Sequence, residues 1–523
     1  MTTGKNYIGD VLSAKGKTTY KTVNPELNSE NDTVFYEAAA DEISKAVALA
    51  EEAFKTYGVI EDAKKADFLE AIAEEIEALG EDLLTTYSQE SGLPAGRANG
   101  ERARTTGQLR AFSAMLREGS WVEAIINKTE GKPDIRRLQI PLGPVAIFGA
   151  SNFPLAFSTA GGDTASALAA GCPVVVKSHP LHAGTGELVA SAVIKAAQRT
   201  GMPNGVFSNL NSSGIEVGTA LVEHPSIKAV GFTGSIKAGT ALCKIAANRP
   251  VPIPVYAEMG SINPVLILPS ALKTDAEKWA QNYAASIVAG TGQFCTNPGL
   301  ILGIKSNELD YFITILALEI DKLEPTCMLH PNIKAQYERL KSEVLGEEGY
   351  YTQQTNLERS VKPNYALQNV ITVNGDIFLK NKTFHKEVFG PFSVVVKCDD
   401  IEQLNEIILD LEGQLTGTVL NGDLNEWEDF KEVIENLKNK VGRLIFNNVP
   451  TGVEVCSAMT HGGPFPASSD SKFTSVGLTA VKRWVRPVTF QDWPNQLLPV
   501  ALQDSNPLGI NRIVNDIVTH NPI

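Results

Sequence analysis

The chain has 523 residues, which is too long for one hydrophobic core, so we expect two or three domains. Hydrophobic residues make up 43% and charged residues 20%, as is ordinary for a water-soluble globular protein. The formal net charge of −14 argues against nucleic acid or an anionic membrane as the main partner.

The N-terminal sequence and the cysteine spacing argue against a secreted protein and against a metal site. The N-terminal residues "MTTGKNYIGDVLSAKGKTTY" lack the apolar core of a signal peptide. The six cysteines are scattered, with no CxxC pair and no metal-ligand spacing. We therefore expect a cytoplasmic protein that keeps its thiols reduced and holds no metal.

The first segment carries apolar residues at helical spacing. Phe68, Ile72, Ile76 and Leu79 recur among Glu and Ala until "ESGLP" breaks the pattern, so we expect this segment to be helical and amphipathic. From Trp121 two strand-like runs flank the turn "TEGKP", which predicts a β-hairpin arm. An arm that leaves the body exposes strand edges, so it needs a partner to cover it.

Residues 138–162 carry no charge and are numerous enough to span a bilayer. Three prolines and Asn152 interrupt the stretch, and its apolar runs are short. We interpret it as a buried strand, a loop and the start of a helix.

Short apolar strands then alternate with helices. The runs "GPVAIFG", "CPVVVKS", "GVFSNL" and "IKAVGFTG" are each followed by a helical stretch. This alternation predicts βαβ units and a parallel sheet, whose ligands bind beyond the carboxyl ends of the strands. A second α/β region begins near Ser261, and the Pro-rich C-terminal residues 485–523 predict an ordered strap.

Several predicted strands end in residues that could bind a ligand or take part in catalysis, although each also has a purely structural interpretation. Lys177 ends "PVVVK" and points to a ligand crevice or to solvent. Glu258 ends "IPVYAEMGS", where apolar neighbours should raise its pKa and suit it to general-base work. Gly234 begins a turn into a helix that could approach a phosphate, and Asn152 could donate to an oxyanion. Cys295, in "GTGQFCTNPG", lies on a polar, Gly-rich loop more typical of a nucleophile than of a core cysteine.

Taken together and in order, these segments resemble the aldehyde dehydrogenase superfamily over essentially the whole chain. The matching pieces are "SNFP", "PVVVK", "GMPNGVF", "GFTGS", "EMGSINP", "GQFCTNPG" and "EVFGPF". The resemblance implies an α/β fold with a Rossmann-like parallel-sheet cofactor domain (1–120 and 144–260), an α/β catalytic domain (261–460), and a small β oligomerisation arm with a C-terminal strap (121–143 and 485–523). It also implies a homodimer or homotetramer.

The resemblance further implies a role for each matching residue. Cys295 corresponds to the nucleophile that attacks a small-molecule aldehyde, Glu258 to the base that activates either the nucleophile or the hydrolytic water, and Asn152 to the oxyanion-hole side chain. For the dinucleotide, the corresponding residues are Lys177 with its neighbours Ser178, His179 and Pro180, the turn Gly234–Ser235, and Glu387 with Phe389.

The C-terminal third narrows the resemblance. Most superfamily members carry "PFGG" here, whereas this chain has "HGGPFPASSDSKFTSVG". That pattern is similar to the α-ketoglutarate semialdehyde dehydrogenases and the fatty aldehyde dehydrogenases, in which the histidine, here His461, lies near the catalytic cysteine. We expect α-ketoglutarate semialdehyde as substrate, with a medium- or long-chain aliphatic aldehyde as the alternative. The resemblance puts a helix with Arg104 and Arg110 beside the substrate tunnel, along with Phe153 and Phe157, and either arginine could bind the substrate carboxylate.

The cofactor is NAD or NADP, and two departures from relatives bear on the choice. Many NAD-preferring relatives carry a glutamate where this chain has Pro180, so a contact that selects NAD is missing. An NADP-specific relative has an arginine after the "GVFxxL" strand, where this chain reads "NSSGIEVG". We expect dual use with a modest preference for NADP. A cofactor-independent cysteine acyltransferase or hydrolase, and a catalytically silent homologue, are the remaining alternatives.

Overall fold

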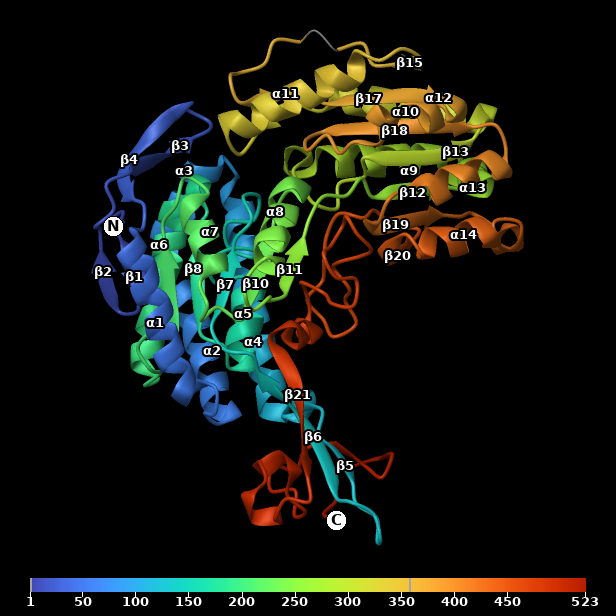
Figure 1. Cartoon of the computed structure of the whole chain (residues 1–523). Coiled ribbons are helices and arrows are strands. Elements are labelled where there is room, and N and C mark those ends of the chain that lie inside the picture. The colour runs from blue at the N-terminus through green and yellow to red at the C-terminus, as the bar shows by residue number, and fades with distance from the viewer. Residues whose placement is uncertain (1, 357–358) are drawn as a thin grey trace.

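The computed structural model describes residues 2–356 and 359–523, and it arranges them around two seven-stranded sheets and a five-stranded one (Figure 1). The first sheet has a parallel centre of five strands, to which β1 adds antiparallel on β9. Its strands, in order across the sheet, are β11 (Val255–Glu258), β10 (Ala229–Thr233), β7 (Val145–Phe148), β8 (Val174–Lys177), β9 (Phe207–Leu210), β1 (Asn6–Ile8) and β2 (Val11–Ser13).

Helices cover both faces of this sheet, as the strand–helix alternation predicts. Val145 and Ile147 pack with one set of helices, and Ala146 and Phe148, which point the opposite way along the same strand, pack with the other. The first set is α2 (Asp62–Ala78), α3 (Gly80–Ser91), α4 (Ala95–Glu118), α5 (Gly162–Ala170) and α6 (Ala183–Arg199). The second set is α1 (Ala40–Tyr57), α7 (Glu216–Glu223) and α8 (Ile236–Ala247).

The second sheet is parallel except for one antiparallel edge strand. Its strands, in order, are β15 (Tyr350–Tyr351), β17 (Asn369–Asn374), β18 (Phe392–Cys398), β13 (Leu300–Ile304), β12 (Pro264–Ile267), β19 (Gln414–Leu420) and β20 (Val441–Phe446). On one face lie α9 (Pro269–Val288) and α10 (Asn307–Lys322). On the other lie α11 (Pro331–Leu345), α12 (Gly375–Lys380), α13 (Ile401–Asp410) and α14 (Lys431–Lys438).

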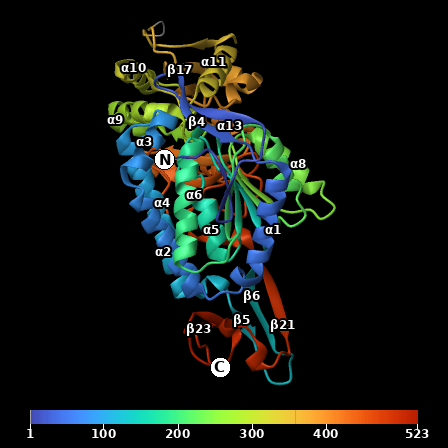
Figure 2. The same ribbon diagram turned by 90° about the vertical axis from the view of Figure 1, so that its left-hand side faces the viewer.

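The predicted hairpin is present and forms the middle of the third sheet, which projects from the body (Figures 1 and 2). Chain-distant strands flank it, because the C-terminal strap supplies three of the five. The order is β21 (Val485–Gln491), β6 (Ile135–Pro141), β5 (Ile125–Asn127), β22 (Arg512–Val514) and β23 (Ile517–Thr519).

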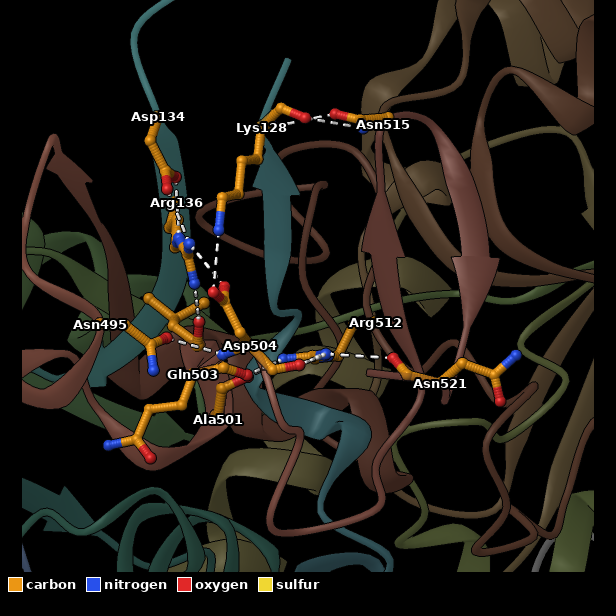
Figure 3. A network of polar contacts seen from close by, with 11 residues as sticks. Lys128, Asp134, Arg136, Asn495, Ala501, Gln503, Asp504, Arg512, Asn515 and Asn521 are labelled. Carbon is orange, nitrogen blue, oxygen red and sulfur yellow. Dashed lines mark hydrogen bonds and ion pairs between the residues drawn. The ribbon is translucent and has the colours of Figure 1, made fainter. Parts of the chain in front are cut away.

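A polar network fastens the strap to the hairpin (Figure 3). Asp504 accepts from Lys128 at 2.8 Å and from Arg136 at 2.7 Å, and Arg136 also pairs with Asp134 at 2.7 Å. Arg512 is almost completely buried and donates to strap carbonyls, among them that of Gln503 at 2.5 Å. These ion pairs and hydrogen bonds join the strap to the hairpin, and the strap is an ordered part of the arm sheet, as predicted.

The expectation of a purely helical first segment is wrong for its first forty residues. Two strands join the first sheet, and β3 (Thr19–Asn24) pairs with β4 (Ser29–Tyr36). The run "SENDTVFY" in β4 is mostly polar and partly exposed, so its pairing leaves only a weak alternating pattern in the sequence.

The uncharged stretch 138–162 becomes the end of β6, all of β7, a loop and the first residue of α5, as interpreted from its prolines. Across residues 2–356 and 359–523, the structure contains no helix long and apolar enough to cross a membrane.

Candidate active site

Cys295 lies in the loop between α9 and β13, directly after the short 3-10 helix η3 (Ala289–Gly292). Gly290 and Gly292 both have positive φ, +56° and +64°. A Cβ atom on Gly292 would lie 2.2 Å from the backbone carbon of Gly390, so this position tolerates no side chain. The glycines of this loop therefore bring two backbones together beside the sulfur.

Asn263 holds the cysteine loop in place, and it was not identified from the sequence. Its amide Nδ2 donates to the carbonyl of Cys295 at 2.9 Å and to that of Asn297 at 2.8 Å. Its Oδ1 accepts from Thr416 at 2.9 Å, which fixes the orientation of the amide. In the sequence it is only the Asn of "EMGSINP", soon after the strand that carries Glu258; its burial and its φ of +49° emerge from the structure.

Three reactive side chains meet at the loop. Cys295 Sγ lies 3.5 Å from His461 Nε2, which lies 3.2 Å from Glu258 Oε2. The three atoms all lie within 4.8 Å of one another. Glu258 and His461 are buried, at 3% and 1% exposure, so the groups interact in a medium of low polarity.

The segment from His461 to Ser475 runs beside the end of β11 and brings the histidine to the glutamate. The backbone N–H of Met259 donates to the carbonyl of Ala467 at 2.8 Å, and Glu258 forms an isolated antiparallel bridge with Ser468. Ser475, which the sequence did not single out, donates to Glu258 Oε2 at 3.1 Å.

The electrostatics differ from the expectation for Glu258. Burial alone would raise its pKa, but the charge of His461 and hydrogen bonds from His461, Ser475 and Cys295 outweigh burial and lower it. The predicted raised pKa is therefore wrong, since the sequence could not reveal these partners. Burial, reinforced by the negative charge of Glu258, raises the pKa of the Cys295 thiol well above its usual range. The resting thiol is therefore protonated and needs a base to become a nucleophile.

Asn152 reaches the same loop from the first sheet. Its Nδ2 donates to the carbonyl of Gln293 at 2.9 Å, which holds the amide two residues from Cys295. The loop that carries Asn152 is fixed by Glu101, whose carboxylate accepts from the backbone N–H groups of Leu155 and Ala156 at 2.8 and 2.9 Å. Glu101 is a further residue that the sequence did not single out.

A cavity of about 560 Å³ opens onto Cys295. Phe153, Phe157 and Phe294 form an aromatic wall, with ring centroids 5.1 and 5.5 Å from that of Phe153. Three arginines also line the cavity: Arg97, Arg104 and Arg443. Glu101, which pairs with Arg97 at 3.4 Å, and Glu454 line the cavity too, so the arginines outnumber the carboxylates by one, and this excess of positive charge beside the nucleophile favours an anionic ligand.

The structure separates the two arginines proposed from the sequence. Arg104 lines the cavity, with its guanidinium 5.1 Å from the ring of Phe157. Arg110 lies six residues further along α4, about 240° around the helix, and forms a two-pronged ion pair with Glu77 at 2.6 and 2.9 Å. Arg110 is thus not a cavity residue. Arg97, stacked 4.4 Å over Phe153, and Arg443 were missed because nothing local distinguishes them from surface arginines.

The predicted ribose-binding residues follow β8. Burial lowers the pKa of Lys177 to about 8, opposed by the charge of Glu37. Ser178 is completely buried, which counts against a direct bond to a phosphate. His179 stacks on His182, and its Nδ1 accepts the N–H of Leu181 at 3.3 Å, so its Nε2 is free to carry the proton. Pro180 begins the 3-10 helix η2 (Pro180–His182).

The other predicted dinucleotide residues lie in two places: at the start of α8, and in a small cleft near the Cys295 loop. Gly234 precedes Ser235, the N-cap of α8, whose hydroxyl accepts from the N–H of Ala238 at 3.3 Å. Glu387 and Phe389 line a small cleft that also includes Phe294. Burial raises the pKa of Glu387 to about 7, with an N–H of Ser261 opposing and the charge of Glu258 adding to the shift.

Comparison with known proteins agrees with this geometry. The model of the aldehyde dehydrogenase family matches residues 11–465. Alpha-ketoglutaric semialdehyde dehydrogenase 2 of Azospirillum brasilense is 45% identical over 525 residues, 98% of each chain. The alpha-ketoglutaric semialdehyde dehydrogenase of Acinetobacter baylyi is 44% identical over 529 residues, 99% of each. A solved 1-pyrroline-5-carboxylate dehydrogenase from Thermus with bound NAD shares the fold, with a TM-score of 0.80 at 21% identity, over 93% of this chain and 92% of that one. The chain therefore belongs to the aldehyde dehydrogenase family and is an aldehyde-oxidising oxidoreductase, as the sequence predicted.

Proposed function

We propose that the protein oxidises α-ketoglutarate semialdehyde to α-ketoglutarate, with NAD⁺ or NADP⁺ as the hydride acceptor. The observation that carries the proposal is the cavity at Cys295, where a cysteine, a histidine and a glutamate within 4.8 Å of one another adjoin three arginines. The two relatives at 44–45% identity, named for this activity, support the same substrate. An aliphatic aldehyde, the alternative, would leave the buried Nη1 of Arg104 without a hydrogen-bond partner among the described residues.

The chemistry follows from the groups at the sulfur. For this step the His461 imidazole is neutral with its proton on Nδ1, so that Nε2, 3.5 Å from the sulfur, takes the thiol proton; the imidazolium that forms then donates from Nε2 to Glu258 at 3.2 Å. The thiolate attacks the aldehyde carbon, and Asn152 with the backbone N–H of Cys295 donates to the oxyanion. A dinucleotide held by the residues below would supply its nicotinamide as the hydride acceptor, and loss of hydride from the carbon bonded to Sγ would leave Cys295 as a thioester. Glu258 then draws a proton from water, which attacks the Cys295 thioester and releases the acid.

The residues around the first sheet fit a dinucleotide. The N-terminus of α8, capped by Ser235 behind Gly234, offers unpaired N–H groups and a positive dipole end to a pyrophosphate. Lys177 and Glu387 would hold the two riboses by hydrogen bonds, and Phe389 would pack beside the nicotinamide. Residues 1–120 and 144–260 are thus the proposed cofactor domain, and residues 261–460 are the proposed catalytic domain.

For the substrate, we propose that Arg104 binds the carboxylate, since it is the predicted arginine that lines the cavity. The test is a steady-state comparison of 2,5-dioxopentanoate with pentanal, following reduced nicotinamide. A value of kcat/KM at least about tenfold higher for the acid is expected, because a charge-assisted bond to the guanidinium is strong. Equal values for the two aldehydes would reject the semialdehyde, and no turnover without added NAD(P)⁺ is expected of either.

Replacing Pro180 with Glu should shift cofactor use toward NAD⁺. We infer dual use with a modest preference for NADP⁺, because proline neither bonds a ribose hydroxyl nor repels a 2′-phosphate. Glu37 limits that preference: it accepts from Ser213 and Gly214 in the very loop that follows β9, and its charge acts on Lys177. The added carboxylate should change the ratio of kcat/KM values by about tenfold or more, or ~1.4 kcal/mol. An unchanged ratio, or a wild type strictly dependent on NAD⁺, would assign the choice to another residue.

The protein should be a homo-oligomer in which the arm, residues 121–143 and 485–523, lies against a second copy. Both β21 and β23 lie at edges of the arm sheet, and β23 carries Ile517 and Val518 at 69% and 70% exposure. Edges and apolar side chains of this kind are ordinarily covered. Light scattering at micromolar concentration should give a dimer or tetramer mass, and a monomer mass would contradict this assignment.

The six unpaired cysteines support a reducing, cytoplasmic setting.

A further inference from the structure

Arg443 is a cavity residue that neither the sequence motifs nor the proposed chemistry uses. It lies on β20, the edge strand of the second sheet, and lines the cavity that holds Cys295. Its Nη1 donates to the carbonyl of Gly452 at 2.9 Å and its Nη2 to that of Pro450 at 2.8 Å. The guanidinium is thereby held in one orientation against the segment from Pro450 to Val453, which we call the closing segment.

Arg104 reaches the same closing segment from α4, on the other side of the cavity. Its Nη2 donates to the carbonyl of Val453 at 3.2 Å. The two guanidiniums thus bond to consecutive residues of the closing segment, Gly452 and Val453. Both arginines line the cavity that holds the sulfur of Cys295, so an anionic group bound by them lies in the same cavity as the nucleophile.

The two arginines differ in the donors that they leave unused. Within the part of the chain that the structure describes, Arg104 Nη1 is buried without a hydrogen-bond partner, while its Nη2 makes a single long bond. Arg104 can therefore present two parallel donors, which is the geometry that a carboxylate requires. In Arg443 Nη1 donates to a carbonyl and contacts Met459 Sδ at 4.0 Å, and Nη2 donates to a second carbonyl, so three of its five N–H groups have partners; the buried Nε has none among the described residues. With fewer donors left than Arg104, Arg443 suits a single oxygen, such as that of a ketone.

We propose that Arg443 binds the 2-oxo oxygen of 2,5-dioxopentanoate, next to the carboxylate on Arg104, so that the cavity selects a 2-oxo acid over the corresponding simple aldehyde acid. This inference rests on the proposed function. In α-ketoglutarate semialdehyde the ketone is adjacent to the carboxylate, as the two guanidiniums are adjacent along the closing segment. The aldehyde, at the far end of the five-carbon chain, is then left for Cys295.

Both guanidiniums are charged when the substrate enters. Burial lowers the pKa of Arg443 and of Arg104; the charge of Glu101 opposes the effect most in Arg104, and that of the Cys295 thiolate, once it forms, opposes it in Arg443. An arginine whose ordinary pKa exceeds 12 nevertheless stays protonated at neutral pH. Arg443 therefore makes a charge-assisted bond, and its loss should cost more than that of a neutral donor.

Three five-carbon aldehydes separate the roles. 2,5-Dioxopentanoate and 5-oxopentanoate differ only in the 2-oxo oxygen, and pentanal lacks both the carboxylate and the 2-oxo oxygen. Arg443→Met, which keeps a long apolar side chain, should lower kcat/KM for 2,5-dioxopentanoate by about tenfold or more relative to 5-oxopentanoate. Arg104→Met should lower both acids together and spare pentanal. Arg110→Met removes an arginine from α4 outside the cavity and should leave all three ratios unchanged.

Equal losses for the two acids in Arg443→Met would overturn the role of Arg443 and leave the proposed function standing. Wild-type protein that oxidises pentanal as well as either acid would overturn the proposed function instead. Because Arg443 also supports the closing segment, a second measurement needs no variant. Inhibition of the wild type by 2-oxoglutarate should be at least about tenfold stronger than inhibition by glutarate, which lacks only the 2-oxo oxygen. Equal inhibition by the two diacids would refute the inference even if the variant fails to fold.

Discussion

Cys295→Ala should abolish aldehyde oxidation, with a loss in kcat on the order of a thousandfold or more, because the sulfur forms the covalent bond through which the reaction passes. Binding of NAD⁺ or NADP⁺ should be retained, since the proposed dinucleotide residues lie on the first sheet, α8 and the 387–389 loop. Steady-state turnover and calorimetric titration of the cofactor measure the two quantities on one preparation. The pocket loses only one sulfur atom, so the fold should be unaffected.

The matched control is Cys456→Ala, since Cys456 is exposed and does not line the cavity. This variant should keep full activity. Turnover that survives in Cys295→Ala would move the nucleophile to another residue. Loss of cofactor binding together with turnover would mean that the variant reports on folding of the loop, which Asn263 holds in place, rather than on the thiol.

Glu258→Gln should uncouple the two halves of the reaction. The carboxylate is the proposed base for hydrolysis, and a positioned base typically contributes ~10²–10⁴-fold. Glutamine has the same shape and keeps the contacts to His461 and Ser475 at 3.2 and 3.1 Å, but it cannot take the proton from water. A burst of reduced nicotinamide close to one per active site, followed by slow turnover, is the expected time course.

His461→Gln provides the contrast, because His461 Nε2 is the atom 3.5 Å from the sulfur. Here the first half-reaction should slow and the burst should disappear, since the raised pKa of the Cys295 thiol leaves it protonated without a base. If Glu258→Gln slows acylation and deacylation to the same extent, the glutamate supports the histidine and another group activates the water.

Local sequence signals were sufficient for much of the fold. The strands β7, β8, β9 and β10 are short apolar runs bounded by turns, and both the hairpin and the Cys295 loop are marked by glycine. β4 was missed because its sequence is mostly polar and its pairing with β3 leaves only a weak alternating pattern. Asn263 and Ser475 were missed at the site because no local pattern distinguishes them from other polar residues; only the fold brings them to Cys295 and Glu258.

Arginines show the limit most clearly. Arg104 and Arg110 lie on the same helix, α4, yet Arg104 lines the cavity and Arg110 pairs with Glu77 at the surface. Helical spacing separates them once the buried face of α4 is known, but that face is set by packing against α2. Arg443 lies 148 residues beyond the cysteine, and no pattern around it indicates a cavity. The predicted rise in the pKa of Glu258 was wrong for a related reason, since His461 and Ser475 come from a segment more than 200 residues further along the chain.

The mass of the trapped enzyme tests directly whether Cys295 carries the substrate as a thioester. Glu258→Gln protein is mixed with 2,5-dioxopentanoate and NADP⁺, quenched in acid within the burst, digested and analysed by mass spectrometry. The peptide that contains Cys295 should gain the mass of the 2-oxoglutaryl group, and alkylation of that thiol before mixing should prevent the gain. An unmodified Cys295 peptide in a sample that has produced one equivalent of reduced nicotinamide, or the adduct on any other residue, would contradict the proposed mechanism.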